Sequence, residues 1–144
     1  MEINGMAHVF LTVSDFDACR AFYGGLLPAL GMKPVMDVDG WYYCVGGRTA
    51  VGITRGDPAH AGRFVQTRVG LHHLCFRARN RADVDEAYEL VQKLGAKVVH
   101  PPQEDGFAPG YYSLLFEDPD GIRLEINHVP GRGLLQESGP AAGT

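Results

Sequence analysis

Several features that would mark other classes of protein are scarce or absent in this sequence. Its 144 residues include only three cysteines, an odd number at irregular spacing, which argues against a disulfide framework and favours a reducing, cytoplasmic location. No apolar run approaches the roughly 20 residues that a membrane span needs. There is no basic cluster and the net charge is −4, so we expect neither a nucleic-acid nor a membrane partner.

What remains is the composition of an ordinary globular domain. Hydrophobic residues make up 45% and charged residues 21% of the chain. A chain of this length can bury a stable core without disulfides or structural metal ions. We expect one domain over residues 1–129. The stretch 130–144 is rich in glycine and proline and is expected to form a C-terminal tail.

Two short stretches indicate an internal duplication. "LGMKPV" (30–35) and "LGAKVV" (94–99) share leucine, glycine, lysine and valine at matching positions. In the same way, His8 begins "HVFLTV" and His73 begins "HLCFRA" 65 residues later. Such a repeat is typical of two copies of one supersecondary unit that pack against each other.

The pattern of each copy predicts a strand, a helix and three further strands. In the first copy, residues 7–13 alternate as a strand does, and a helix follows a capping box formed by Ser14 and Asp17. In the second copy, residues 71–78 predict a strand and residues 82–94 a helix. The fold class is therefore α+β with two tandem βαβββ modules. We place module one at 6–55, a connector at 56–68 and module two at 69–129.

The adjacent histidines of "GLHHLCF" (70–76) raise the question of which one is functional. Neighbouring side chains on a strand point to opposite faces. His72 shares its face with Leu74 and Phe76, so we expect it to pack against the helices. His73 matches His8 in the duplication, which favours His73 as the functional residue. The residues that share a face with His8 or His73 are Phe10 and Thr12 in module one, and Cys75 and Arg77 in module two.

The last predicted strand, "GIRLEINHV", carries a carboxylate between two apolar residues. Leu124 and Ile126 flank Glu125, so Glu125 points away from the face that packs against the helices. A carboxylate that faces a cavity must be paired, protonated or bound to a cation. Arg123 and Asn127 share the face of Glu125, and an ion pair between Arg123 and Glu125 is therefore the alternative to a metal.

Two histidines and one carboxylate on converging strands suit a divalent transition metal with open coordination positions. The candidate ligands are His8, His73 and Glu125. Imidazole nitrogen and carboxylate oxygen can bind Fe(II), Mn(II), Zn(II), Ni(II) or Co(II), and among these Fe(II) or Mn(II) is favoured.

These motifs resemble the vicinal oxygen chelate superfamily. The resemblance rests on the paired βαβββ pattern, on "HVFLTVSD", "GLHHLCF" and "FEDPDGIRLEI", and covers residues 6–129. That superfamily includes glyoxalase I, methylmalonyl-CoA epimerase, extradiol dioxygenases, fosfomycin-resistance thiol transferases and bleomycin-binding resistance proteins. The resemblance implies curved mixed sheets around a metal cleft, the ligands His8, His73 and Glu125, and a homodimer. Whether the ligands meet within one chain or across two is open at this point.

The sequence departs from the four-ligand members of the superfamily at one position. Laying "CVGGRTAVGI" (44–53) over "EDPDGIRLEI" (117–126) places Gly52 opposite Glu125. Glycine offers no ligand, which counts against an ordinary glyoxalase I. Gly52 either leaves room for a substrate beside the metal or marks a local bulge in the strand.

Three residues are candidates for proton transfer near the metal. His100 ends "KVVH", and Tyr111 and Tyr112 lie in the loop "FAPGYY" (107–112). Edge packing and loop hydrogen bonds are the alternative role for each. The residues expected to line the substrate pocket are Phe10, Thr12, Gly52, Cys75, Arg77, Arg123 and Asn127.

The resemblance implies a metal-dependent enzyme that binds a small substrate through two neighbouring oxygens, such as a catechol, an α-hydroxy ketone or an α-keto acid derivative. The missing fourth ligand favours an extradiol-type dioxygenase over a glyoxalase- or epimerase-like lyase or isomerase. Fosfomycin transfer is disfavoured because "EDGFAPGYYS" lacks the polar, cation-binding loop of those enzymes. The alternative to an enzyme is a drug-binding resistance protein that holds no metal. The presence of all three candidate ligands argues against this alternative.

Overall fold

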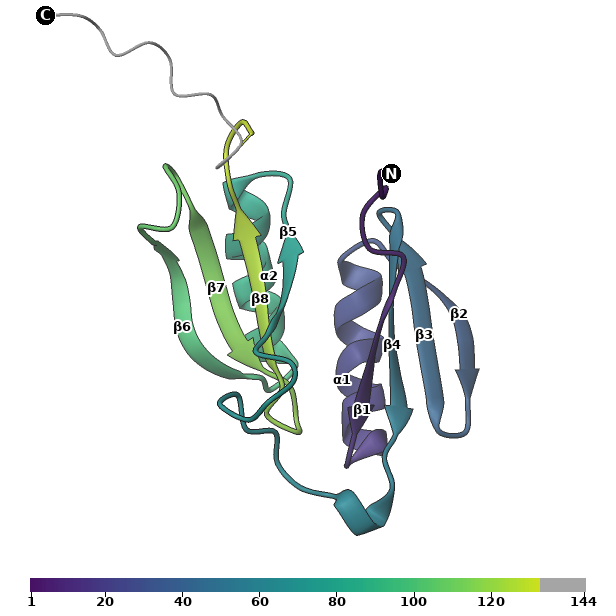
Figure 1. Cartoon of the computed structure of the whole chain (residues 1–144). Coiled ribbons are helices and arrows are strands. Elements are labelled where there is room, and N and C mark those ends of the chain that lie inside the picture. Colours follow the sequence, from purple (N-terminus) through teal and green to yellow (C-terminus); the bar gives the residue numbers. More distant parts are fainter. Residues whose placement is uncertain (133–144) are drawn as a thin grey trace, which may run out of the picture.

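The fold is α+β and consists of two βαβββ modules in sequence, as the duplication predicts (Figure 1). The structure is a computed structural model and describes residues 1–132. The strands are β1 (Val9–Val13), β2 (Lys33–Val38), β3 (Trp41–Gly46), β4 (Thr49–Arg55), β5 (Leu74–Arg77), β6 (Lys97–Glu104), β7 (Tyr112–Glu117) and β8 (Arg123–His128). The helices are α1 (Phe16–Ala29) and α2 (Arg81–Lys93), and one turn of 3-10 helix (Pro58–His60) lies in the connector.

Each module forms one four-stranded mixed sheet. The strand order is β1-β4-β3-β2 in the first sheet and β5-β8-β7-β6 in the second. In both sheets the first strand of the module runs parallel to the last, β1 to β4 and β5 to β8. His8 and His73 each directly precede the first strand of their module, so they occupy equivalent places.

The helices begin at side-chain caps. Asp15 caps α1, because its carboxylate accepts a hydrogen bond from the backbone N–H of Ala18 at 3.0 Å; the sequence had placed this cap one residue earlier. Asn80 and Asp83 form a reciprocal capping box at the start of α2. A cap of this kind contributes about 1 kcal/mol to helix stability.

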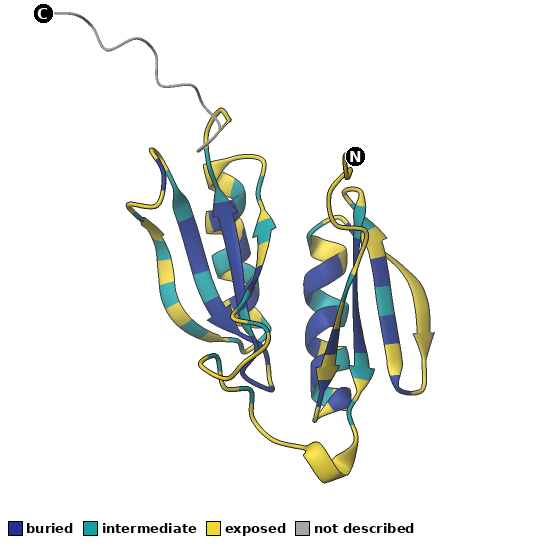
Figure 2. Ribbon diagram, viewed as in Figure 1, coloured by how far each residue is buried: buried dark blue, intermediate teal, exposed yellow. Residues whose placement is uncertain are grey.

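The two modules share one core, which lies around the helices (Figure 2). The ring of Phe22 on α1 packs against Phe116 on β7 with 6.4 Å between centroids. A Cβ at Gly25 of α1 would lie 2.6 Å from a methyl group of Leu94, so the glycine permits this close approach of α1 to the end of α2. We call the face of each sheet opposite its helix the open face. Because the helices meet in the shared core, the two open faces are turned away from it.

The turn between β7 and β8 joins module two to the start of α1. The carboxylate of Asp120 accepts hydrogen bonds from the backbone N–H groups of Ser14 and Asp15. Asp118, which is 3% exposed, accepts from the Tyr23 hydroxyl and from the Ile122 N–H, each at 2.8 Å. Burial raises the pKa of Asp118 from 3.8 to about 6, and these hydrogen bonds only partly oppose the rise.

Three expectations from composition can be compared with this structure. All three cysteines are free thiols. Within residues 1–132 no helix is both long and apolar enough to cross a membrane. The proposed C-terminal tail falls, from residue 133 onward, outside the described residues.

Candidate functional site

A polar cluster surrounds the buried carboxylate of Glu125 on the open face of the second sheet. Glu125 is 8% exposed and belongs to β8. The hydroxyl of Tyr111 donates a hydrogen bond to Oε1 of this carboxylate. Nε2 of His73 lies 3.1 Å from the other oxygen, Oε2. The strand pairing places Cys75 beside Glu125 on the neighbouring strand.

Two neutral donors surround this carboxylate. Burial, followed by the hydrogen bond to Glu125, raises the pKa of Tyr111 to about 12. Burial of the thiol and the negative charge of Glu125 raise the pKa of Cys75 to about 12 as well. Both groups therefore keep their protons at neutral pH. The structure thus brings together His73, Glu125, Tyr111 and Cys75, which the sequence had singled out separately.

His72 is not the core residue that the alternation of strand residues predicted. Its side chain is exposed, and its Nδ1 lies 2.7 Å from Nδ1 of His73 and 3.2 Å from Nε2 of Gln66. The expectation was wrong because β5 begins only at Leu74. The alternation of side chains holds only within a strand, so it does not fix the direction of side chains that precede the strand.

Arg123 does not form the ion pair with Glu125 that the sequence offered as an alternative. Its Nε lies 3.5 Å from Oε1 of Glu117, the residue directly opposite on β7. Glu117 is 6% exposed and also pairs with Arg63 and Lys97. Arg123 therefore belongs to a separate cluster of charges, and it does not neutralise Glu125.

Two of the three candidates for proton transfer lie away from Glu125. The hydroxyl of Tyr112 donates to Asp85 on α2 at 2.6 Å, which places Tyr112 on the helix-covered face, because adjacent strand residues point to opposite sides. Nδ1 of His100 donates to the carbonyl oxygen of Pro101 at 2.9 Å. His100 pairs with Leu115, which in turn pairs with Glu125, so it lies about 10 Å from that position across two strand spacings.

Two pocket residues expected on the second sheet do occupy the face of Glu125. Asn127 is two residues further along β8 and is 8% exposed, and its side chain lowers the pKa of Tyr111 against the larger effect of burial. Arg77 pairs with Asn127 across β5 and β8 and is exposed. These residues extend the polar surface from Glu125 towards the end of the strands.

The open face of the first sheet carries aromatic rings. Phe10 stacks on Tyr43 with 5.1 Å between ring centroids and meets Trp41 edge-on at 5.4 Å. His8 lies next to them, 5.9 Å from Phe10. We call Phe10, Trp41 and Tyr43 the aromatic wall. Of these three rings only Phe10 was expected to line the pocket, although Trp41 and Tyr43 alternate with the buried Tyr42 and share one face for that reason.

Gly52 is the residue that makes room for the aromatic wall. A Cβ at this position would lie 2.5 Å from Phe10 and 2.8 Å from Tyr43. Gly52 pairs in regular register with both of these residues, so the expectation of a local bulge is wrong. The space that the missing side chain leaves is filled by protein rings, and a substrate does not need to enter it.

His8 does not join His73 and Glu125 within one chain. Across residues 1–132, no three His, Cys, Asp or Glu side chains are arranged so that they could hold a metal ion. His73 and Glu125 offer one imidazole nitrogen and one carboxylate oxygen 3.1 Å apart, which fits two ligands of a divalent metal. The remaining candidate ligand lies on the other module, beside the open face of the other sheet.

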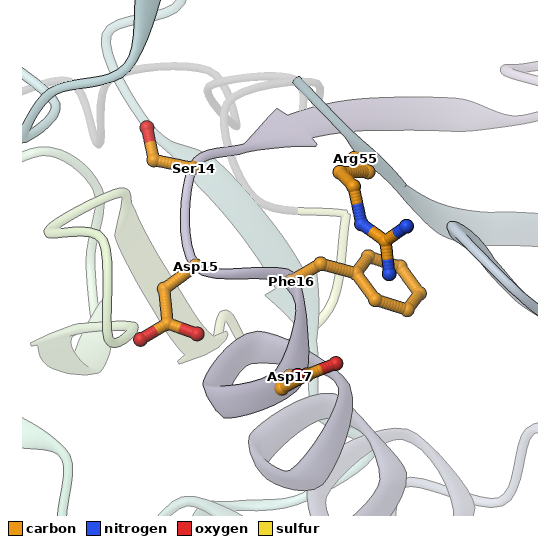
Figure 3. A pocket seen from close by; sticks show the side chains of 5 residues that line it. All are labelled: Ser14, Asp15, Phe16, Asp17 and Arg55. Atoms are coloured by element: carbon orange, nitrogen blue, oxygen red, sulfur yellow. The ribbon is translucent and has the colours of Figure 1, made fainter. Parts of the chain in front are cut away.

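Two cavities of the described residues lie away from these side chains. A shallow hollow of about 510 Å³ is lined by Ser14, Asp15, Phe16, Asp17 and Arg55 (Figure 3). It lies past the end of β1, whereas His8 precedes the start of this strand. A second cavity, of about 210 Å³, lies next to it and includes Thr12. Thr12, expected to line the substrate pocket, therefore lies towards the end of β1 away from His8.

Comparisons with known proteins agree with this architecture. The family model described as the Glyoxalase/Bleomycin resistance protein/Dioxygenase superfamily matches residues 5–126. The uncharacterized protein YqjT of Bacillus subtilis (strain 168) is 32% identical over 124 residues, which are 84% of this chain and 96% of that protein.

Solved structures show the same fold. A glyoxylase/bleomycin resistance protein/dioxygenase domain from Frankia sp. EAN1pec has a TM-score of 0.71 and 30% identity, with coverage of 88% of this chain and 98% of that one. Lactoylglutathione lyase from Agrobacterium tumefaciens has a TM-score of 0.64 and 22% identity, with coverage of 89% and 96%, and at this identity the likeness concerns the fold alone. The chain therefore belongs to the Glyoxalase/Bleomycin resistance protein/Dioxygenase superfamily.

Proposed function

We propose that the protein is a divalent-metal-dependent enzyme whose metal site is completed by a second copy of the chain. His73 and Glu125 of one chain and His8 of the partner subunit would be the ligands. The observation that carries this proposal is the pair formed by Nε2 of His73 and the buried carboxylate of Glu125, 3.1 Å apart. No cationic side chain is paired with this carboxylate among the described residues, since Arg123 is directed to Glu117.

The open faces explain why two chains are needed. In one chain they are turned away from the shared core, so the aromatic wall and the Glu125 cluster do not line a common pocket. In a symmetric homodimer, the open face of the first sheet of one chain can lie over the open face of the second sheet of the other, and symmetry then creates two identical sites. Each site would receive His8 and the aromatic wall from one chain and His73, Glu125 and Tyr111 from the other.

Each residue of the proposed site has a distinct task. A bound metal supplies a Lewis acid and a template for two neighbouring substrate oxygens, and Fe(II) or Mn(II) fits these ligands. Tyr111 orients the Glu125 carboxylate through its hydrogen bond, and its raised pKa keeps a proton available at the hydroxyl oxygen. Free thiols are compatible with a reducing, cytoplasmic location.

The aromatic wall supports an aromatic substrate such as a catechol, and with it the extradiol-type dioxygenase. Three rings over Gly52 offer a flat apolar surface, against which another ring can stack or pack edge-on. The same site could support glyoxalase- or epimerase-like lyase or isomerase chemistry. That chemistry needs a base to move a proton, and Glu125 is the one carboxylate of the described residues placed beside His73.

A second candidate function is binding of a small molecule without metal. The observation in its favour is that no three-ligand group forms within residues 1–132 of one chain. The sheet surfaces would then bind their ligand through the aromatic wall and the neutral donors around Glu125. This candidate predicts that the dimer contains no stoichiometric metal.

Elemental analysis of the protein purified without chelators separates these functions. We expect about one equivalent of Fe or Mn per chain in the wild type and the His60→Ala control, and less than about a tenth in His8→Ala, His73→Ala and Glu125→Ala. Oxygen uptake with a panel of catechols then tests the reaction, because consumption of O₂ supports the dioxygenase and its absence favours the lyase or isomerase. A wild-type dimer without metal would establish the binding protein instead.

A further inference from the structure

A chain of side-chain contacts continues from the Glu125 pair to the surface. Nε2 of Gln66 lies 3.2 Å from Nδ1 of His72, and this same nitrogen lies 2.7 Å from Nδ1 of His73. The other ring nitrogen of His73 faces Glu125. Gln66 belongs to the connector between the modules, for which the sequence predicts no function.

Coordination through Nε2 decides which nitrogen of His73 carries a proton. The Nε2 atom that faces Glu125 can bind a metal only through its lone pair, so the proton of the neutral ring then lies on Nδ1. Nδ1 of His72, 2.7 Å away, is the acceptor placed to receive a hydrogen bond from that N–H group. The side chain of Gln66, 3.2 Å from the same nitrogen of His72, contacts this ring from the connector.

We propose that His72, held by Gln66, is a positioning residue that keeps the proton of His73 on Nδ1 and so leaves Nε2 free to coordinate. This inference rests on the proposed metal site. A histidine that binds a metal through one nitrogen donates the N–H of the other to an outer partner, and that partner fixes the tautomer and the orientation of the ring. The pair in "GLHHLCF" then has two roles, with His73 as ligand and His72 as its acceptor.

The obvious alternative for His72 is an exposed histidine without a role. An exposed residue can be replaced with little effect on folding, and variants at this position test the contact directly. His72→Phe keeps a ring of similar size but removes the acceptor. His72→Asn retains a side-chain oxygen near the position of Nδ1. His60→Phe, at another exposed histidine, serves as the matched control.

The first measurement is the affinity of the purified dimer for Zn(II), determined at one pH by competition with a chelator. Loss of an outer partner costs 10–100-fold in metal affinity, and the exposure of His72 favours the lower end, about 10-fold for His72→Phe. We expect unchanged stoichiometry and thermal stability in that variant, recovery of most of the affinity in His72→Asn, and no change in His60→Phe.

The second measurement does not depend on affinity. In the Zn(II)-loaded wild type, nitrogen-15 NMR should show the proton of His73 on Nδ1 and slow exchange of this proton with water. The exchange should become fast in His72→Phe and slow again in His72→Asn.

The outcomes separate the two proposals. Wild-type affinity and slow exchange in His72→Phe, or an equal defect in His72→Asn, would overturn the positioning role alone. A wild-type dimer that binds no Zn(II) would overturn the metal site and the positioning role together.

Discussion

Replacement of Asp118 by asparagine should remove one component of the pH dependence of stability. Asp118 is 3% exposed, and its burial raises the pKa from 3.8 to about 6. Asparagine keeps a side-chain oxygen that can accept the hydrogen bond from the Ile122 N–H, but it has no proton to lose. The comparison therefore isolates the ionisation of one carboxyl group in the turn that joins module two to α1.

The sign and the magnitude follow from proton linkage. Between pH 3.8 and about 6 the folded protein holds a proton on Asp118 that the unfolded chain has lost. The contribution of Asp118 is therefore fully present below the lower value and is lost as the pH rises through the upper one. At about 1.36 kcal/mol for each pKa unit, the wild type should lose about 3 kcal/mol relative to Asp118→Asn over this interval.

Urea unfolding followed by circular dichroism, in the presence of a chelator, measures this difference at a series of pH values from about 4 to 7. Other titrating groups are common to both proteins and largely cancel in the comparison. The difference in free energy of unfolding should change by about 3 kcal/mol in favour of the variant as the pH rises. Parallel pH profiles for the two proteins would refute the assignment of a raised pKa to Asp118.

Three further predictions concern the two open faces. Gly52→Ala should lower the free energy of unfolding by about 1–3 kcal/mol, because its Cβ would lie 2.5 Å from the nearest ring. Gly62 has open space around it, so Gly62→Ala should change the free energy of unfolding in urea by less than about 0.5 kcal/mol. Equal losses of stability in the two glycine variants would contradict the packing argument. Tyr111→Phe should lower the free energy of unfolding in urea by about 1.5–3 kcal/mol, and Tyr112→Phe should lower it by less than about 1 kcal/mol. The reverse order would contradict the placement of the two hydroxyl groups. Cys75, with its pKa at about 12, should react with iodoacetamide far more slowly than free cysteine, and an equal rate by mass spectrometry would contradict the raised pKa.

The sequence predicted the modules because their signals are local and repeated. Strand alternation, helical spacing and the matching histidines indicated both βαβββ units, and the equivalence of His8 and His73 favoured His73 over His72 as the candidate ligand. Cys75 and Glu125 were placed on one face by the two-residue period, which holds within β5 and β8. Tyr111 was identified as a candidate from its loop, and the structure supplies its hydrogen bond to Glu125.

Other features could not be obtained from local patterns. His72 lies before the strand, so its place depends on where β5 begins. Arg123 pairs with Glu117 because that residue lies directly opposite on β7. The register of two neighbouring strands cannot be predicted from either strand alone. The arrangement of the open faces depends on how the helices pack against each other, which no local pattern in either helix predicts. The partner of His72 lies in the connector, where no periodicity guides a prediction.

The most direct test of the account is to mix two variants that are each expected to lack metal. His8→Ala and Glu125→Ala each damage both sites of their own homodimer. A mixed dimer holds both changes in one site and leaves the other intact, if the ligands come from two chains. After dissociation and random re-association, metal analysis should recover about a quarter of the wild-type content. No recovery, with mixed dimers demonstrated by mass spectrometry, would contradict a metal site shared between two chains.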